Sequence, residues 1–140
     1  MTIVTRRWKF GGFGRGPASK TLELTTGFYT PTLTNVANLS ASTAARLRFQ
    51  RLGDIVTVFG KVTVDCVSAG VLTRLGISLP IASNLTDAGD CGGSAHMTAI
   101  QGDSAGIIGD ATDNRAELSF VACQPSEQVM TVHFQYVVLV

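Results

Sequence analysis

The chain has 140 residues with 11 basic and 10 acidic side chains, which give a formal net charge of +1. Charged residues make up only 15% of the sequence and the mean hydropathy is +0.27, a composition that favours association with other chains over a free monomer. The length fits one compact domain plus an arm, and because no long apolar run occurs we expect neither a membrane span nor a secretory signal.

The first twenty residues differ in composition from the rest of the chain. They hold five cations and no acid, whereas residues 21–140 hold six basic and ten acidic side chains, a balance of −4. Aromatic rings and glycines are interleaved with these cations without a sustained helical or strand period. We therefore predict an extended N-terminal arm over residues 1–20, held by a neighbouring chain, followed by a β-sandwich domain over residues 21–140. The arm residues predicted to bind a partner are Arg6, Arg7, Trp8, Lys9, Phe10, Phe13 and Arg15.

Two short strands are predicted directly after the arm. Residues 21–25 and 28–34 have strand character, and Pro31 restricts the second strand to an edge or a bulge because it lacks a backbone donor. Residues 35–42 are small and polar, which favours a loop.

The next segment carries the strongest strand signal in the chain. In residues 55–65 apolar residues, mostly valines, alternate with polar side chains, the period of two that is typical of a strand with one buried face. Residues 45–50 alternate in the same way, and Gly53 in the short connection can adopt a positive φ. The two runs predict a β-hairpin, with Val58 fully buried in its apolar face.

The rest of the chain continues as strands separated by polar turns. A turn-rich stretch at residues 83–94 is the longest predicted loop and a candidate binding loop. Further strands are predicted at residues 70–78, 95–101, 105–109, 115–123 and 129–140.

The C-terminal strand is apolar on both faces. Every second residue from Met130 to Val138 is apolar or aromatic, and past Tyr136 the opposite face is apolar as well. Such a strand is buried on both sides, either centrally or under another subunit, so Val137 and Leu139 are predicted oligomer contacts. Eight or nine strands without a long helix predict an all-β fold, namely a two-sheet antiparallel β-sandwich of the jelly-roll type with an extended N-terminal arm.

No residue pattern predicts an active site. His96 and His133 are distant in sequence, and no nucleophile motif accompanies them. The arm glycines lack the flanking strand and helix of a phosphate-binding loop, and the aspartates lie in turns without calcium-loop spacing. The three cysteines are an odd number without C-x-x-C spacing, which favours reduced thiols. We therefore expect no enzymatic activity, no catalytic residues, no cofactor and no metal.

Nucleic acid is a weaker candidate partner for the arm. Its interleaved cations and aromatic rings could stack on a single strand, because cations meet phosphates and rings meet bases. The −4 balance of residues 21–140 argues against that use.

Residues 26–64 carry two linked motifs. The chain reads GFYTPTLT from residue 27 and then F-x-R-x-G-D-x-V-T-V-x-G-x-V from Phe49 to Val62. Together they resemble a recurring pattern of tailed-phage virion proteins. The pattern is similar to β-sandwich domains of small capsid-cementing (decoration) proteins and of tail-fibre tips, and the rest of the chain matches only in style. The resemblance implies a bacteriophage virion structural protein without enzymatic activity.

The short arm favours a stand-alone protein clamped onto a lattice over the end of a long fibre. On this reading the protein bridges subunits of the major capsid protein and self-associates as a dimer or trimer. It would lie on the outer capsid surface of the virion after assembly in the host cytoplasm. The alternative is a receptor-binding tip of a tail fibre, in which the loop at residues 83–94 meets a host-surface glycan or protein.

Overall fold

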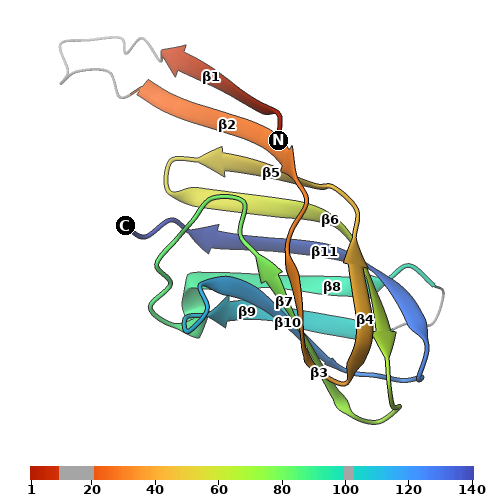
Figure 1. The fold of residues 1–140 in the computed structure, drawn as a ribbon. Helices are drawn as coiled ribbons and strands as arrows, with labels where there is room; N and C mark the ends of the chain where they lie inside the picture. Colours follow the sequence, from red (N-terminus) through yellow and green to blue (C-terminus); the bar gives the residue numbers. More distant parts are fainter. Residues whose placement is uncertain (10–20, 100–102) are drawn as a thin grey trace.

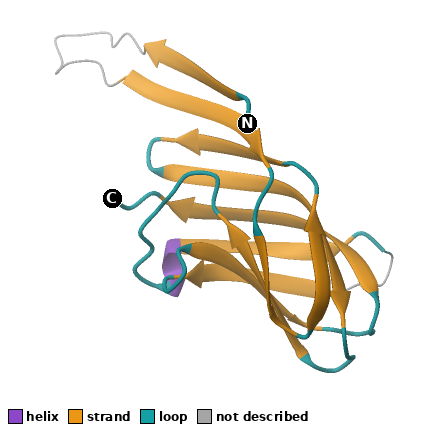
Figure 2. Ribbon diagram, viewed as in Figure 1, coloured by secondary structure: helices purple, strands orange, loops and turns teal. Residues whose placement is uncertain are grey.

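The computed structural model describes residues 1–9, 21–99 and 103–140 of the chain. These residues form eleven strands and one short 3₁₀ turn, η1 (Ala88–Asp90), and Figures 1 and 2 show how strands dominate the molecule. The strands are β1 (Ile3–Lys9), β2 (Thr21–Tyr29), β3 (Leu33–Ala37), β4 (Leu39–Ala44), β5 (Leu47–Leu52), β6 (Ile55–Cys66), β7 (Leu72–Ser78), β8 (Cys91–Met97), β9 (Ser104–Asp110), β10 (Arg115–Val121) and β11 (Glu127–Val137).

All eleven strands belong to one antiparallel sheet. Its hydrogen-bonded order is β1-β2-β5-β6-β11-β8-β9-β10-β7-β3, and β4 pairs with β6. The sheet curls, so that β3, β4 and β7 cross the direction of β11, β8 and β9 in Figure 1. The all-β prediction is confirmed. The strands form one continuous curled sheet, so the two separate sheets of the predicted sandwich are not confirmed.

Strand β6 explains why the sheet is continuous. It is 12 residues long, and β11 pairs with it along one edge from Ile55 to Asp65. On its other edge β5 pairs with the first half and β4 with the second half. One long strand therefore joins the parts that a sandwich would divide between two sheets.

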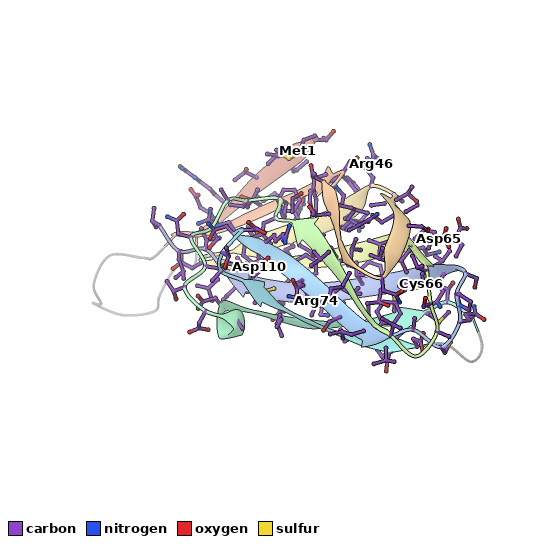
Figure 3. The ribbon with its side chains drawn as sticks, turned by 60° about the horizontal axis from the view of Figure 1, so that its bottom comes forward. Met1, Arg46, Asp65, Cys66, Arg74 and Asp110 are labelled. Carbon is purple, nitrogen blue, oxygen red and sulfur yellow. The ribbon has the colours of Figure 1, made fainter. Side chains whose placement is uncertain are left out.

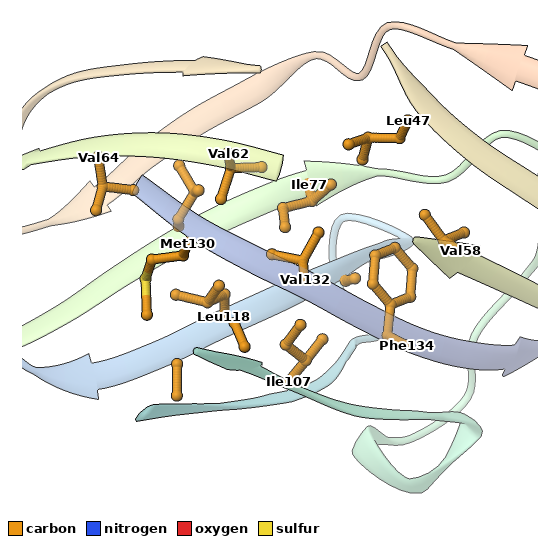
Figure 4. Close-up of a cluster of buried hydrophobic side chains, with 14 of the residues drawn as sticks. Leu47, Val58, Val62, Val64, Ile77, Ile107, Leu118, Met130, Val132 and Phe134 are labelled. Atoms are coloured by element: carbon orange, nitrogen blue, oxygen red, sulfur yellow. The ribbon is translucent and has the colours of Figure 1, made fainter. Parts of the chain in front are cut away.

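The core lies inside the curl. The alternating valines of β6 are at most 1% exposed, and Figure 4 shows Val58, Val62 and Val64 with Met130 and Leu118, which come from β11 and β10. Gly60 interrupts the valines because a Cβ there would collide with the Leu47 side chain, which fills that part of the core. The hairpin prediction is confirmed, including the positive φ of 60° at Gly53.

The segment expected to be a loop at residues 35–42 instead contains parts of β3 and β4. Asn38 makes the turn between them with a φ of 54°, and its amide donates hydrogen bonds to Ser68 O (2.9 Å) and Thr73 Oγ1 (2.8 Å). The loop prediction is wrong because pairing with β7 and β6 outweighs the low strand propensity of small polar residues.

We expect Val58→Asp to abolish soluble folding. Val58 is fully buried, and an unpaired carboxylate in its place would lose its hydration without gaining a partner. Thr57→Asp, one residue away on the opposite face of β6, is the matched control and should fold. Circular dichroism and thermal unfolding of the soluble fractions measure the difference. A soluble Val58→Asp protein with the wild-type melting temperature would show that the two faces of β6 are assigned the wrong way round.

Candidate functional site

The predicted arm begins as a strand of the chain's own sheet. β1 pairs with β2 from Ile3↔Gly27 to Lys9↔Thr21, and β2 in turn pairs with β5. This pair of strands extends beyond the curled body at one end of the sheet (Figure 1). Residues 3–9 are therefore held by β2 of their own chain, and contact of the arm with a neighbouring chain stays a prediction.

Four of the seven predicted arm contacts are residues that the structure describes. Arg6 and Arg7 are exposed on β1, and Trp8 and Lys9 belong to the same strand. The other three predicted contacts lie outside the described residues, namely Phe10, Phe13 and Arg15.

Arg6 and Arg7 lie on opposite faces of the β1–β2 pair. Arg7 Nε donates to Glu23 Oε1 at 2.8 Å, on the face that continues toward the core. Arg6 lies opposite Leu24 on the other face and has no acidic partner among the described residues. The sequence pattern treated these two arginines alike, because only the strand register separates them.

A cluster of two arginines and one ring lies beside the arm. The guanidinium carbons of Arg46 and Arg48 are 4.8 Å and 4.9 Å from the centroid of the Phe28 ring, and both arginines are exposed. Two hollows adjoin the ring: one reaches Arg48 and the other reaches Arg46 and Met1, which Figure 3 shows at the same edge of the molecule. Sequence reasoning missed this site, because the alternating arginines of residues 45–50 indicated only a strand.

The C-terminal segment is held by its own chain. Val137 is half-buried and pairs with Ile55, while Leu139 N donates to Ser83 Oγ at 2.9 Å. The Asn84 N–H in turn donates to Leu139 O at 3.0 Å. Contacts within the chain thus account for part of the burial expected of Val137 and Leu139, and their role in an oligomer stays a prediction.

The long loop predicted at residues 83–94 is held by hydrogen bonds within the loop itself. The Asp90 carboxylate accepts hydrogen bonds from the backbone N–H and hydroxyl of Thr86 and from the backbone of Asp87, which hold the pKa of Asp90 below its ordinary value. Leu85 is buried, and β8 already begins at Cys91. The loop is therefore shorter and more constrained than the sequence predicts.

The two histidines come closer together than their sequence distance suggests. On the adjacent strands β8 and β11, His96 lies opposite Thr131 and His133 lies opposite Ser94, so the histidines are diagonal neighbours on one exposed face. Across the described residues there is no group of three or more histidine, cysteine or carboxylate side chains arranged to hold a metal ion.

The three cysteines occupy two kinds of environment. Burial raises the pKa of the Cys91 thiol to about 12 and also raises the pKa of Cys66. Cys123 is exposed, and its pKa is raised chiefly by a hydrogen bond to the Asp103 carboxylate.

No protein-family model, curated protein or solved structure matches the chain. In the part of the chain that the structure describes, no helix has the length and apolar character needed to cross a membrane.

In the native protein we expect Cys123 to be alkylated by iodoacetamide, and Cys66 and Cys91 to react only after unfolding. The thiolate is the reactive form, so a raised pKa and burial both slow the reaction. Asp103→Asn should speed alkylation of Cys123 at pH 8, because it removes the carboxylate that raises the thiol pKa. Peptide mass spectrometry identifies the labelled residues. Equal native labelling of all three thiols would contradict these environments.

Removal of residues 138–140 should lower the free energy of unfolding. It deletes the hydrogen bonds of Val138 N to Asp54 O and of Leu139 with Ser83 and Asn84, each worth about 1 kcal/mol. Urea unfolding measures stability, and light scattering measures size. A loss of stability at constant size assigns Leu139 to contacts within the chain, whereas a smaller particle supports the oligomer contact. Unchanged stability and size would contradict both roles.

Proposed function

We propose that the chain is a non-enzymatic structural protein of a bacteriophage virion that cements the capsid by bridging subunits of the major capsid protein. The observation that carries this proposal is the β1–β2 pair, which extends from the body and ends the hydrogen-bonded order of the sheet at β1. The resemblance of residues 26–64 to virion proteins supplies the class.

The outer edge of β1 is suited to contact with another chain. Within the described residues no strand pairs with that edge, so its backbone N–H and C=O groups can accept a further strand. Arg6 and Arg7 add positive charge beside this edge, which disfavours pairing with a second copy of β1 and favours an acidic partner. Stable interfaces bury about 1,200–2,000 Å² in total, and an arm that carries Trp8 could supply a large share of one contact.

The finer architecture belongs to the same proposal. We take the curled sheet to be a form of the jelly-roll sandwich of cementing proteins, and the jelly-roll cementing protein of a Bordetella podophage is the relative we propose. Self-association as a dimer or trimer on the outer capsid surface completes the proposal.

Location on purified phage particles tests the proposed class directly. Antibody to this chain, viewed by electron microscopy, should label the shell in many copies. Label confined to the tail end would favour the receptor-binding tip instead, and particles without label would refute both virion roles.

Deletion of residues 1–20 should leave a folded body that binds shells lacking the protein only weakly. β2 keeps its pairing with β5, so circular dichroism should retain the strand signal. Arg6→Glu should weaken binding more than Arg7→Glu, because Arg7 is already engaged by Glu23, and high salt should soften the effect. Trp8→Ala should act through lost packing and be insensitive to salt. Full binding by the armless protein at low and high salt would leave the arm without this role.

A further inference from the structure

We infer that the outer face of β2, β5, β6 and β11 is a docking surface for an acidic surface of a different protein. We call it the open face. The inference rests on the proposed function only for naming the partner as the major capsid protein.

Register places side chains of these four strands in rows on one face. Phe28, Arg48, Phe59 and His133 are directly opposed across the strands and form one row. Two rows further along, Leu52 and Ile55 are opposed in the same way. The row between them is polar and uncharged, and no acidic side chain occurs in any of the three rows.

The cations of the open face lack acidic partners. Arg46, Arg48 and Lys61 are exposed, and among the described residues none of them forms a salt bridge. Arg6 on β1 extends the same face and is likewise unpaired within the described chain. Of the acids nearby, Asp54 in the turn pairs with Arg51, and Glu23 on the opposite face pairs with Arg7. Two acids belong to the open face itself, Asp65 and Glu127, which are opposed to each other three rows from Phe59, toward the other end of β6 and β11.

The Phe28 ring holds two like charges close together. Arg46 and Arg48 each lie within 5 Å of its centroid, at 4.8 Å and 4.9 Å. Their charges can therefore be no farther apart than about one Debye length at 0.1 M ionic strength, roughly 10 Å, and their potentials reinforce each other. A carboxylate arriving between them would relieve this repulsion, which makes the pair a ready site for an acidic side chain.

Exposed apolar side chains lie among these cations. Phe59 is 54% exposed, Leu52 is 44% exposed and Ile55 is 42% exposed. Aromatic and arginine side chains are the usual anchors at the centre of a protein interface. A protein partner that carries carboxylates and apolar side chains would use both features.

The charge and the side-chain types weigh against other occupants. Two copies meeting through these three rows around a two-fold axis would bring the cations of one copy against those of the other. Single-stranded nucleic acid stacks successive bases on free rings, and the Phe28 ring is already covered by two guanidinium groups, which leaves Phe59 as the free phenylalanine ring of that row. Leu52 and Ile55 make no favourable contact with phosphates.

Two acidic polymers test the surface without any phage material. The wild-type chain should bind a random copolymer of glutamate and tyrosine more tightly than poly-glutamate of equal length, measured by fluorescence anisotropy at two salt concentrations. Phe59→Ser should abolish that preference, because it removes the apolar contact. The double variant Arg46→Gln, Arg48→Gln should weaken binding of both polymers by about tenfold and reduce the salt dependence.

Matched controls lie away from the open face. Val121→Ser removes an equally exposed apolar side chain, 57% exposed, and Arg51→Gln removes a cation already engaged by Asp54. Both should leave polymer binding unchanged, and every variant should keep the wild-type melting temperature. Loss of binding in the controls would mean that net charge or folding, and not the open face, governs the result.

Other polymers and the oligomeric state supply the outcomes that overturn the inference. Tighter binding of oligothymidylate or heparin through the same residues would reassign the face to nucleic acid or to an anionic glycan. A dimer that Phe59→Ser dissociates, measured by sedimentation, would reassign it to a second copy. Failure of both glutamate polymers to bind would refute it outright.

Particles separate this inference from the proposed function. If antibody finds the chain on shells, radical footprinting should show Phe59 protected on the particle and oxidised in the free protein. A bound chain with Phe59 unprotected would refute the docking surface and leave the cementing role intact. A chain absent from shells would refute the cementing role, and the polymer results would still decide the surface.

Discussion

The structure depends on the pairing of β6 along both of its edges. β11 covers one edge over nearly the whole strand, while β5 and β4 share the other. This pairing forces the sheet to curl, and the curl encloses the valine face of β6 together with β7, β10 and β11. Because side chains alternate strictly, a slip of one residue would exchange Val58 for Phe59 in the core, so the core fixes the outward face as firmly as the inward one.

Local patterns predicted the strands whose alternation is sharp. The hairpin of β5 and β6, the C-terminal strand β11 and the burial of Val58 all follow from a period of two, whereas β8 begins inside the segment predicted as a loop. The patterns missed β3 and β4, whose serines, threonines and asparagines form strands only because β7 and β6 are there to pair with them. They also missed β1, whose cationic sequence forms a strand because it pairs with β2. Both failures concern long-range pairing, which no local period contains.

The candidate site shows the same division. Composition identified the cationic N-terminal segment, but it could not separate Arg6 from Arg7, because the difference is the presence of Glu23 on one face of the neighbouring strand. Nor could it bring Arg46 and Arg48 to Phe28, which is almost twenty residues earlier in the chain. The sequence shows the residue types. Whether each side chain has a partner is decided by the strand register, which the sequence does not show.

The arm and the open face are joined at the end of the sheet where β1 and β2 lie. In the curled sheet one face of β5, β6 and β11 packs in the core, and the other face is exposed. Strands β2 and β1 extend that open face beyond the body. The fold does not require a phenylalanine at position 59, since a half-exposed ring stabilises the monomer far less than a buried one. An exposed ring among unpaired cations is instead what an interface requires. The cationic arm and the open face therefore form one continuous surface, and a single acidic partner could engage both.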